Sequence, residues 1–127
     1  MKDICIVTNK NENILVSLGS CLGKENINIE GLCIVSENEQ SIIHFAVEDI
    51  DKTLSILDTE GIEIGSVSDV YVFSKDEKNI TGKPGSFGEI CLKLKKHNIP
   101  IKFGYPAENN RFIFGVDDIT KTSEILQ

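Results

Sequence analysis

Apolar residues recur along the chain with two periods, and together they predict strands and helices in a regular order. Short apolar runs and every-second-residue alternation predict strands at 4–8, 27–36, 41–47, 62–64, 70–73, from Ile99 onward and at 111–116. Apolar residues at helical spacing predict helices at 14–25, between the cap Asp49 and the terminator Gly61, after Pro84, and from the cap Asp118 to Leu126. Polar turns are expected at 9–13, 38–40 and 107–110, and a longer polar loop at 74–83.

The stretch 84–103 holds the third of these helices and is the most informative part of the chain. One helical face is formed by residues at i, i+3, i+4 and i+7, namely Phe87, Ile90, Cys91 and Leu94. Pro84 suits a first helical turn because its missing N–H would have no partner there. Gly85 allows a backbone or a ligand to approach closely.

The second half of the chain repeats the first. VEDIDKTLSIL, which begins at Val47, aligns with VDDITKTSEIL, which begins at Val116, and Asn26–Ile29 aligns with Asn98–Ile101. Flanking segments that recur in the same order indicate duplication. The sequence therefore predicts two β-α-β-β-α-β repeats, residues 1–67 and 68–127, in an α+β protein. The second repeat reaches Gln127 directly after its last helix, so we expect it to lack the fourth strand.

The alignment also predicts which side of each sheet the helices cover. Phe112, Phe114 and Val116 align with residues 43, 45 and 47, which are also apolar. Because alternate strand residues share a face, this face is expected to lie under the helices. A repeat of about 60 residues would bury little surface alone, so the two repeats are expected to pack as one unit.

Composition is ordinary for a folded protein, with 40% hydrophobic and 26% charged residues among 127. The net charge of −7 argues against a nucleic-acid partner, because phosphate binding depends on clustered Lys and Arg. No apolar run approaches the length of about 18 residues that a membrane span needs. With no signal peptide at Met1 either, we expect a cytoplasmic protein that is not bound to a membrane.

The sequence shows no catalytic constellation, and we expect neither enzyme activity nor a cofactor or metal. His44 lies in a strand pattern and His97 at a helix C-terminus, where a cation is favourable. Cys5, Cys21 and Cys33 show no C-x-x-C spacing and, with Cys91, are interpreted as reduced thiols; a disulfide or a reactive thiol remains an alternative.

Two loops are the candidates for binding a small molecule. Each precedes a helix whose free N-terminal N–H groups and dipole favour a carboxylate. The candidate residues in these loops are Asn11, Glu12, Asn13, Ile14 and Leu15 in the first repeat, and Pro84, Gly85, Ser86 and Phe87 in the second. The start of each second strand adds Asn28 and Ile29, or Pro100 and Ile101. Ordinary turns and an outward-facing Asn28 are the alternative interpretation.

Pro-Gly-x-Phe opening a helix that ends in Asn-Ile-x-Ile resembles the first half of an ACT domain, and both repeats resemble this family over nearly the whole chain. The resemblance implies ferredoxin-like repeats, with antiparallel sheets and helices on one face. In place of the family's loop glycine and strand asparagine stand Gly85 and Asn28, whereas Asn13 and Pro100 depart from the pattern. Our hypothesis is therefore a site that combines Gly85 of one repeat with Asn28 of the other.

The resemblance further implies a non-catalytic regulatory or sensor module that binds a small amino acid through ligand-stabilised pairing of the repeats. A homodimer is expected, since the open edge of the second repeat could pair with another chain. The alternative is a ligand-free interaction module that holds a dimer or docks on a metabolic enzyme.

Overall fold

The computed structural model describes residues 1–9 and 13–127, which form two compact units, Met1–Ser68 and Asp69–Gln127. Unit 1 contains β1 (Lys2–Asn9), α1 (Ile14–Lys24), β2 (Gly31–Glu37), β3 (Gln40–Val47), α2 (Ile50–Thr59) and the start of β4 (Ser66–Asp69). Unit 2 contains β5 (Tyr71–Ser74), α3 (Ser86–Lys96), β6 (Phe103–Ala107), β7 (Arg111–Gly115) and α4 (Ile119–Leu126). The predicted α+β class with ferredoxin-like repeats is confirmed.

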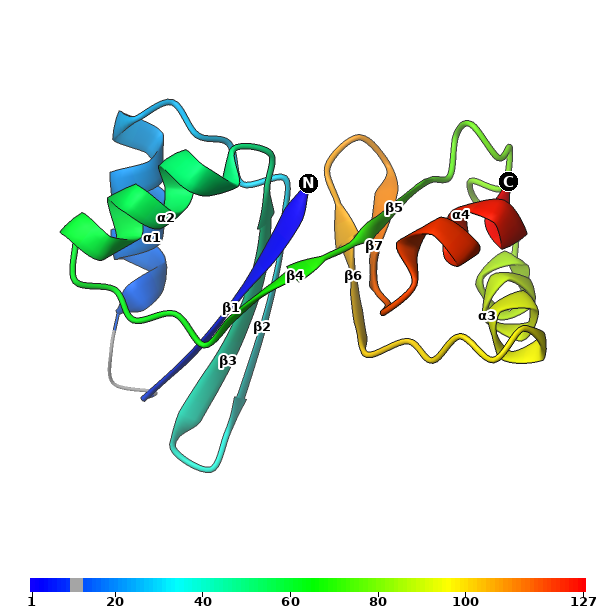
Figure 1. Cartoon of the computed structure of the whole chain (residues 1–127), viewed down its shortest axis with the longest axis horizontal. Helices are drawn as coiled ribbons and strands as arrows, with labels where there is room; N and C mark the ends of the chain where they lie inside the picture. Colours follow the sequence, from blue (N-terminus) through cyan, green and yellow to red (C-terminus); the bar gives the residue numbers. More distant parts are fainter. Residues whose placement is uncertain (10–12) are drawn as a thin grey trace. The chain divides into compact units, whose positions relative to one another are not determined.

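The strand order within each unit is that of a ferredoxin-like sheet. In unit 1 the order is β4-β1-β3-β2, and β3 pairs antiparallel with both β1 and β2. In unit 2 the order is β6-β7-β5, with β7 antiparallel to both neighbours. Figure 1 shows α1 and α2 on one side of the unit 1 strands, and α3 and α4 on one side of the unit 2 strands.

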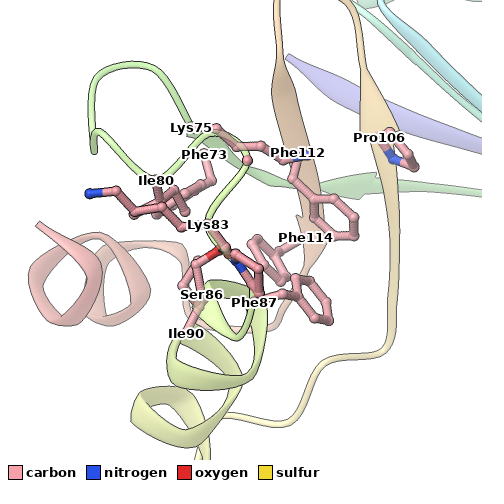
Figure 2. Close-up of a pocket in the computed structure, with 12 residues that line it drawn as sticks. Phe73, Lys75, Ile80, Lys83, Ser86, Phe87, Ile90, Pro106, Phe112 and Phe114 are labelled. Carbon is pink, nitrogen blue, oxygen red and sulfur yellow. Dashed lines mark hydrogen bonds between the residues drawn. The ribbon is translucent and has the colours of Figure 1, made fainter.

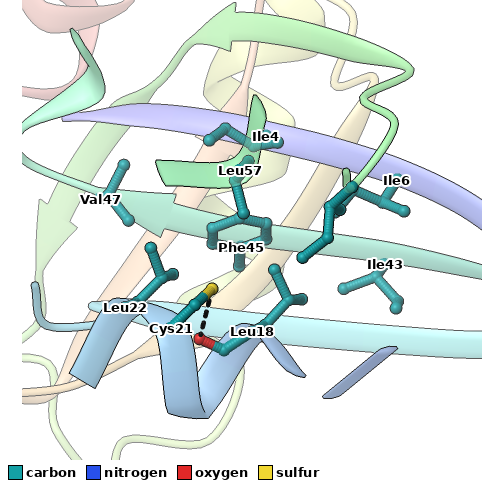
Figure 3. Close-up of a cluster of buried hydrophobic side chains, with 10 residues drawn as sticks. Ile4, Ile6, Leu18, Cys21, Leu22, Ile43, Phe45, Val47 and Leu57 are labelled. Atoms are coloured by element: carbon teal, nitrogen blue, oxygen red, sulfur yellow. Dashed lines mark hydrogen bonds between the residues drawn. The ribbon is translucent and has the colours of Figure 1, made fainter. Parts of the chain in front are cut away.

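The core of unit 1 lies between its helices and the predicted strand face (Figure 3). Ile43, Phe45 and Val47 are fully buried against Leu18 and Leu22 of α1. The corresponding prediction for unit 2 is also confirmed. Phe114 and Val116 are 0% and 2% exposed, and Phe112 is partly buried against the same cluster. Burial of these apolar faces is the main stabilising contribution to each unit.

The predicted strand starts at 27 and 99 are wrong, because the helix ends continue into these residues. Ile27 N–H donates to the Leu22 carbonyl and Ile99 N–H to the Leu94 carbonyl, each at 2.9 Å. These bonds close the ends of α1 and α3 around left-handed asparagines, whose φ values are 58° and 57°. Ile27, Ile29 and Ile99 pack on the cores from these connections, whereas Ile101 is exposed, and the strands begin at Gly31 and Phe103.

The predicted strand at 62–64 is wrong for a similar reason. Ile62 N–H still bonds to the carbonyl of Leu57 in α2 at 2.9 Å, and the Ile62 side chain is in the core. The chain first bonds to β1 at Gly65, whose N–H donates to the Cys5 carbonyl at 2.8 Å. The strand β4 accordingly begins at Ser66.

The most similar segments of the two repeats make the same contacts. Asp49 caps α2 by accepting from Lys52 N–H at 3.1 Å, and Asp118 caps α4 by accepting from Lys121 N–H at 2.9 Å. The Lys52 amine then donates to the Glu25 carbonyl at the end of α1, at 2.8 Å. The Lys121 amine donates to the His97 carbonyl at the end of α3, also at 2.8 Å. The repeated lysine thus ties the two helices of each unit together.

We predict that Asp118→Ala lowers the free energy of unfolding by about 0.5–2 kcal/mol, because α4 loses its N-cap. Asp117→Ala is the matched control, since Asp117 makes an exposed ion pair with Lys102 that is worth about 0–1 kcal/mol. Urea denaturation followed by circular dichroism measures both. An equal loss in the two variants would contradict the cap assignment.

Candidate functional site

Unit 2 contains a cavity of about 470 Å³ between the β5–α3 loop, the start of α3 and the helix-covered face of the sheet (Figure 2). Its volume is in the range of sites that hold small molecules. Twelve residues line it: Phe73, Lys75, Ile80, Gly82, Lys83, Pro84, Ser86, Phe87, Ile90, Pro106, Phe112 and Phe114. All of them belong to unit 2.

A side-chain network holds the loop that forms one wall. The Asp76 carboxylate accepts hydrogen bonds from the Thr81 hydroxyl and from the Asn110 amide, each at 2.7 Å. The Asn110 amide also donates to the Thr81 hydroxyl at 2.6 Å. Lys75 N–H donates to the Asn110 carbonyl at 3.1 Å. The β5–α3 loop is therefore joined to the β6–β7 hairpin.

The helix α3 begins at the cavity without a side-chain cap. Its N-cap residue is Gly85, which has φ 86°, and no side chain accepts a hydrogen bond from the first turn. The helix α1 also lacks a side-chain cap, at Asn13, whereas α2 and α4 are both capped by aspartate. An uncapped helix N-terminus presents N–H donors and positive dipole potential, both of which favour an anion.

Ser86 is turned toward the loop. Its hydroxyl donates to the Lys83 carbonyl at 2.8 Å, and its N–H contacts the same oxygen at 3.3 Å. The left-handed conformation of Gly85 makes this tight turn possible. A Cβ at Gly85 would meet nothing within 4 Å, so a substitution there is disfavoured by backbone strain and not by a steric clash.

Three phenylalanine rings pack against one another at one side of the cavity (Figure 2). Phe87 stacks on Phe114, with centroids 6.3 Å apart and an interplanar angle of 9°, and lies 5.2 Å from Phe112. Phe112 and Phe114 are 4.8 Å apart. Phe87 is nevertheless 51% exposed, so much of its ring remains available for contact.

The charged residues in the cavity wall are Lys75 and Lys83, and no Asp or Glu is among the described residues that line it. This local balance is opposite in sign to the net charge of −7. A positive, partly apolar concavity attracts anionic ligands. The site can therefore bind an anion next to an apolar group.

The structure brings some of the predicted residues together and separates others. Pro84, Ser86 and Phe87 line the cavity, and Gly85 forms the turn between them. Pro100 and Ile101 line a separate cavity of about 480 Å³ with Cys91, Lys95, Asn98 and Ile99.

The remaining candidates belong to unit 1. Ile14 lines a cavity of about 340 Å³ that also includes Gly61. Asn13, Leu15 and Asn28 are exposed, and Ile29 packs against the unit 1 core. Asn11 and Glu12 lie outside the described residues. Ligand contact by any of these residues stays a prediction.

Sequence reasoning missed several residues of the cavity wall. Segment 74–83 was expected to be only a polar loop, yet Lys75, Ile80 and Lys83 contribute to the wall. Phe112 and Phe114 are on the helix-covered face, as predicted, but the sequence did not indicate that they and Phe73 line a cavity. No local signal could have found this wall, because the contacts of Phe87 with Phe112 and Phe114 join distant segments of the chain.

Other polar clusters have a structural explanation. His44 Nδ1 lies 2.8 Å from the Oδ2 of buried Asp3, and His97 Nδ1 donates to the Lys93 carbonyl at 2.9 Å. Burial raises the thiol pKa of Cys5 and Cys21, and all four cysteines are free. Among residues 1–9 and 13–127, no group of His, Cys, Asp or Glu could hold a metal ion. No helix in these ranges is both long and apolar enough to cross a membrane.

Several solved structures share the fold of this chain. A protein from Bacteroides thetaiotaomicron shares 24% identity, with a TM-score of 0.79 over 98% of this chain and 85% of its own. The ligand-free regulatory subunit of aspartate kinase from Thermus thermophilus shares 12% identity, with a TM-score of 0.73 over 98% of this chain and 87% of its own. The regulatory subunit of aspartate kinase from Thermus flavus shares 11% identity, with a TM-score of 0.68 over 98% of this chain and 86% of its own.

No protein-family model and no curated protein matches the sequence. The structural likeness nevertheless shows that the fold is ACT-like and ferredoxin-like. The resemblance expected from the sequence is thereby confirmed for the fold.

We predict that Asp76 stabilises the folded chain in a pH-dependent way. Hydrogen bonds from Thr81 and then from Asn110 lower the pKa of its carboxyl group. A carboxyl group with a lowered folded pKa stabilises the protein above its unfolded pKa of about 3.9, and this contribution is lost as the pH falls through the folded pKa. Wild type should therefore be more stable than Asp76→Asn at pH 7, and the difference should disappear in acid.

Urea denaturation of both proteins between pH 7 and acid measures this difference. The control is the neighbouring Glu77→Gln, whose carboxylate is not part of the network with Thr81 and Asn110. A stability difference that does not change with pH would contradict the assignment.

Proposed function

We propose that the chain is a non-catalytic regulatory or sensor module that binds a free amino acid, with the ligand carboxylate at the start of α3. The observation that carries the proposal is the unit 2 cavity, which combines an uncapped helix N-terminus with two lysines. The proposed carboxylate contacts are Gly85 and the N–H groups of the first turn of α3 that follow Ser86, because the donors of Ser86 itself bond to the Lys83 carbonyl. The fold shared with aspartate kinase regulatory subunits supports a regulatory role.

Regulation in this proposal works by linkage. A ligand changes a protein's conformational population only through its different affinity for the alternative states. In this proposal the β5–α3 loop contacts the ligand. The hydrogen bonds of Asp76 connect this loop to the β6–β7 hairpin, so a movement of the loop on ligand binding also moves the hairpin. We propose that ligand binding stabilises paired ACT repeats in a cytoplasmic homodimer. A metabolic enzyme that binds this homodimer would then respond to the change in its conformation.

One observation favours the alternative of a ligand-free interaction module. Val7, Ile42 and Val35 stand in register across β1, β3 and β2, and they are 50%, 43% and 53% exposed. A row of exposed apolar side chains on a sheet is suited to contact with another protein surface. In that case the cavity would have no ligand.

Thermal unfolding in the presence of each common amino acid distinguishes the two proposals. A ligand specific for the folded state stabilises it by about 2.7 kcal/mol at 100 times its dissociation constant, so one amino acid should raise the melting temperature selectively. The shift should be lost in Gly85→Val, because a β-branched residue strains the positive φ and alters the turn.

The matched control is Asn26→Val, which places the same β-branched residue at φ 58° in unit 1. Its ligand-induced shift should equal that of wild type. Asn28→Ala tests the predicted second contact in the same assay. Unchanged melting with every amino acid would favour the interaction module.

A further inference from the structure

We propose that the unit 2 cavity is selective for a carboxylate with a flat apolar side chain, either an aromatic amino acid or the corresponding aromatic 2-oxo acid. This inference rests on the proposed ligand site and names its chemical class. It departs from the sequence-based expectation of a small amino acid. Three features of the cavity support it: its apolar walls, the geometry of its rings and its charge.

The apolar part of the cavity wall is larger than a small ligand could cover. Phe73, Ile80 and Ile90 line the cavity together with the three packed rings of Phe87, Phe112 and Phe114. Glycine or alanine at the start of α3 would leave most of this surface facing water, whereas a large apolar side chain would displace that water. Discrimination by a hydrophobic pocket amounts to about 10–200-fold per methylene group.

The ring geometry favours a planar group over a branched one. Phe87 and Phe114 are nearly parallel, and Phe87 remains 51% exposed next to the helix N-terminus. Aromatic pairs prefer offset-stacked or edge-to-face contacts, which an additional ring at this position could make. A carboxylate at α3 would place the adjoining side chain beside Phe87, since Ser86 and Phe87 both line the cavity.

A glycine on β6 makes room for one of these rings. Gly104 pairs with Phe114, and a Cβ at Gly104 would lie 2.8 Å from the nearest atom of the Phe112 ring. That is closer than such atoms approach without a shift. The glycine therefore permits Phe112 to lie over β6 at the side of the cavity, and the shape of this wall depends on it.

The charge in the wall explains why the oxo acid belongs to the same ligand class. Lys75 and Lys83 can attract a carboxylate, while no described carboxylate in the wall can pair with an ammonium group. Recognition is therefore expected to require the carboxylate and the ring, and to depend little on the α-amino group.

Isothermal titration of the full chain with five probes tests the inference. L-Phenylalanine and phenylpyruvate should bind, with L-leucine about tenfold weaker and glycine about 100-fold weaker than the aromatic carboxylates. Phenethylamine has the ring but no carboxylate, so it should not bind.

Two variants with matched controls assign the contacts. Phe112→Leu should weaken the binding of an aromatic carboxylate about tenfold, whereas Phe103→Leu should leave it unchanged because Phe103 is not among the residues that line the cavity. Lys83→Gln should weaken binding and reduce its dependence on salt, in contrast to Lys96→Gln at the other end of α3. Circular dichroism confirms that each variant is folded.

The outcomes separate this inference from the proposed function. Tighter binding of glycine than of phenylalanine would overturn the aromatic preference and leave amino-acid binding intact. Binding of phenylpyruvate without phenylalanine would overturn the amino-acid proposal and support the ligand class inferred here. If the folded wild-type protein binds none of the probes, the aromatic preference is wrong, and the thermal assay with every common amino acid then decides the proposed function.

Discussion

Buried apolar faces hold each unit together, and a repeated lysine joins the ends of the two helices that cover them. Lys52 and Lys121 each lie in the first turn of a helix, and their amines reach the carbonyl at the end of the preceding helix. Such carbonyls have no partner inside their own helix, and the negative end of the dipole favours a cation. One side chain therefore satisfies the end of one helix and fixes its distance from the other.

This arrangement divides the helices of each unit into two kinds. The helices α2 and α4 are closed at their N-termini by aspartates and provide the lysine. The helices α1 and α3 receive that lysine at their C-termini, while their N-termini have no side-chain cap. The same two helices follow the loops that are the binding candidates. The side-chain hydrogen bonds are thus concentrated at one end of each helix pair, and the N-termini of α1 and α3 have no side-chain cap.

The sequence was sufficient for the fold but not for the cavity, and particular residues show why. The periodicity and the repeated Asp and Lys are local signals, so the helices, their caps and the covered sheet face could be predicted. Ile27, Ile62 and Ile99 were assigned to strands because their alternation reflects burial, which a core-packed connection shares with a strand. The contact between Phe87 and Phe112 joins distant segments, and no local pattern reports it.

The hydrogen bonds of Asn110 have a consequence for how this chain can vary. Asn110 has φ 55° in the β6–β7 turn, and its amide reaches Asp76 and Thr81 on a loop about thirty residues earlier. An ordinary surface turn tolerates many substitutions, but this one must keep both a left-handed backbone and a correctly placed donor. Because positions 76, 81 and 110 share one hydrogen-bond network, the stability effects of substitutions at these positions are expected to be non-additive.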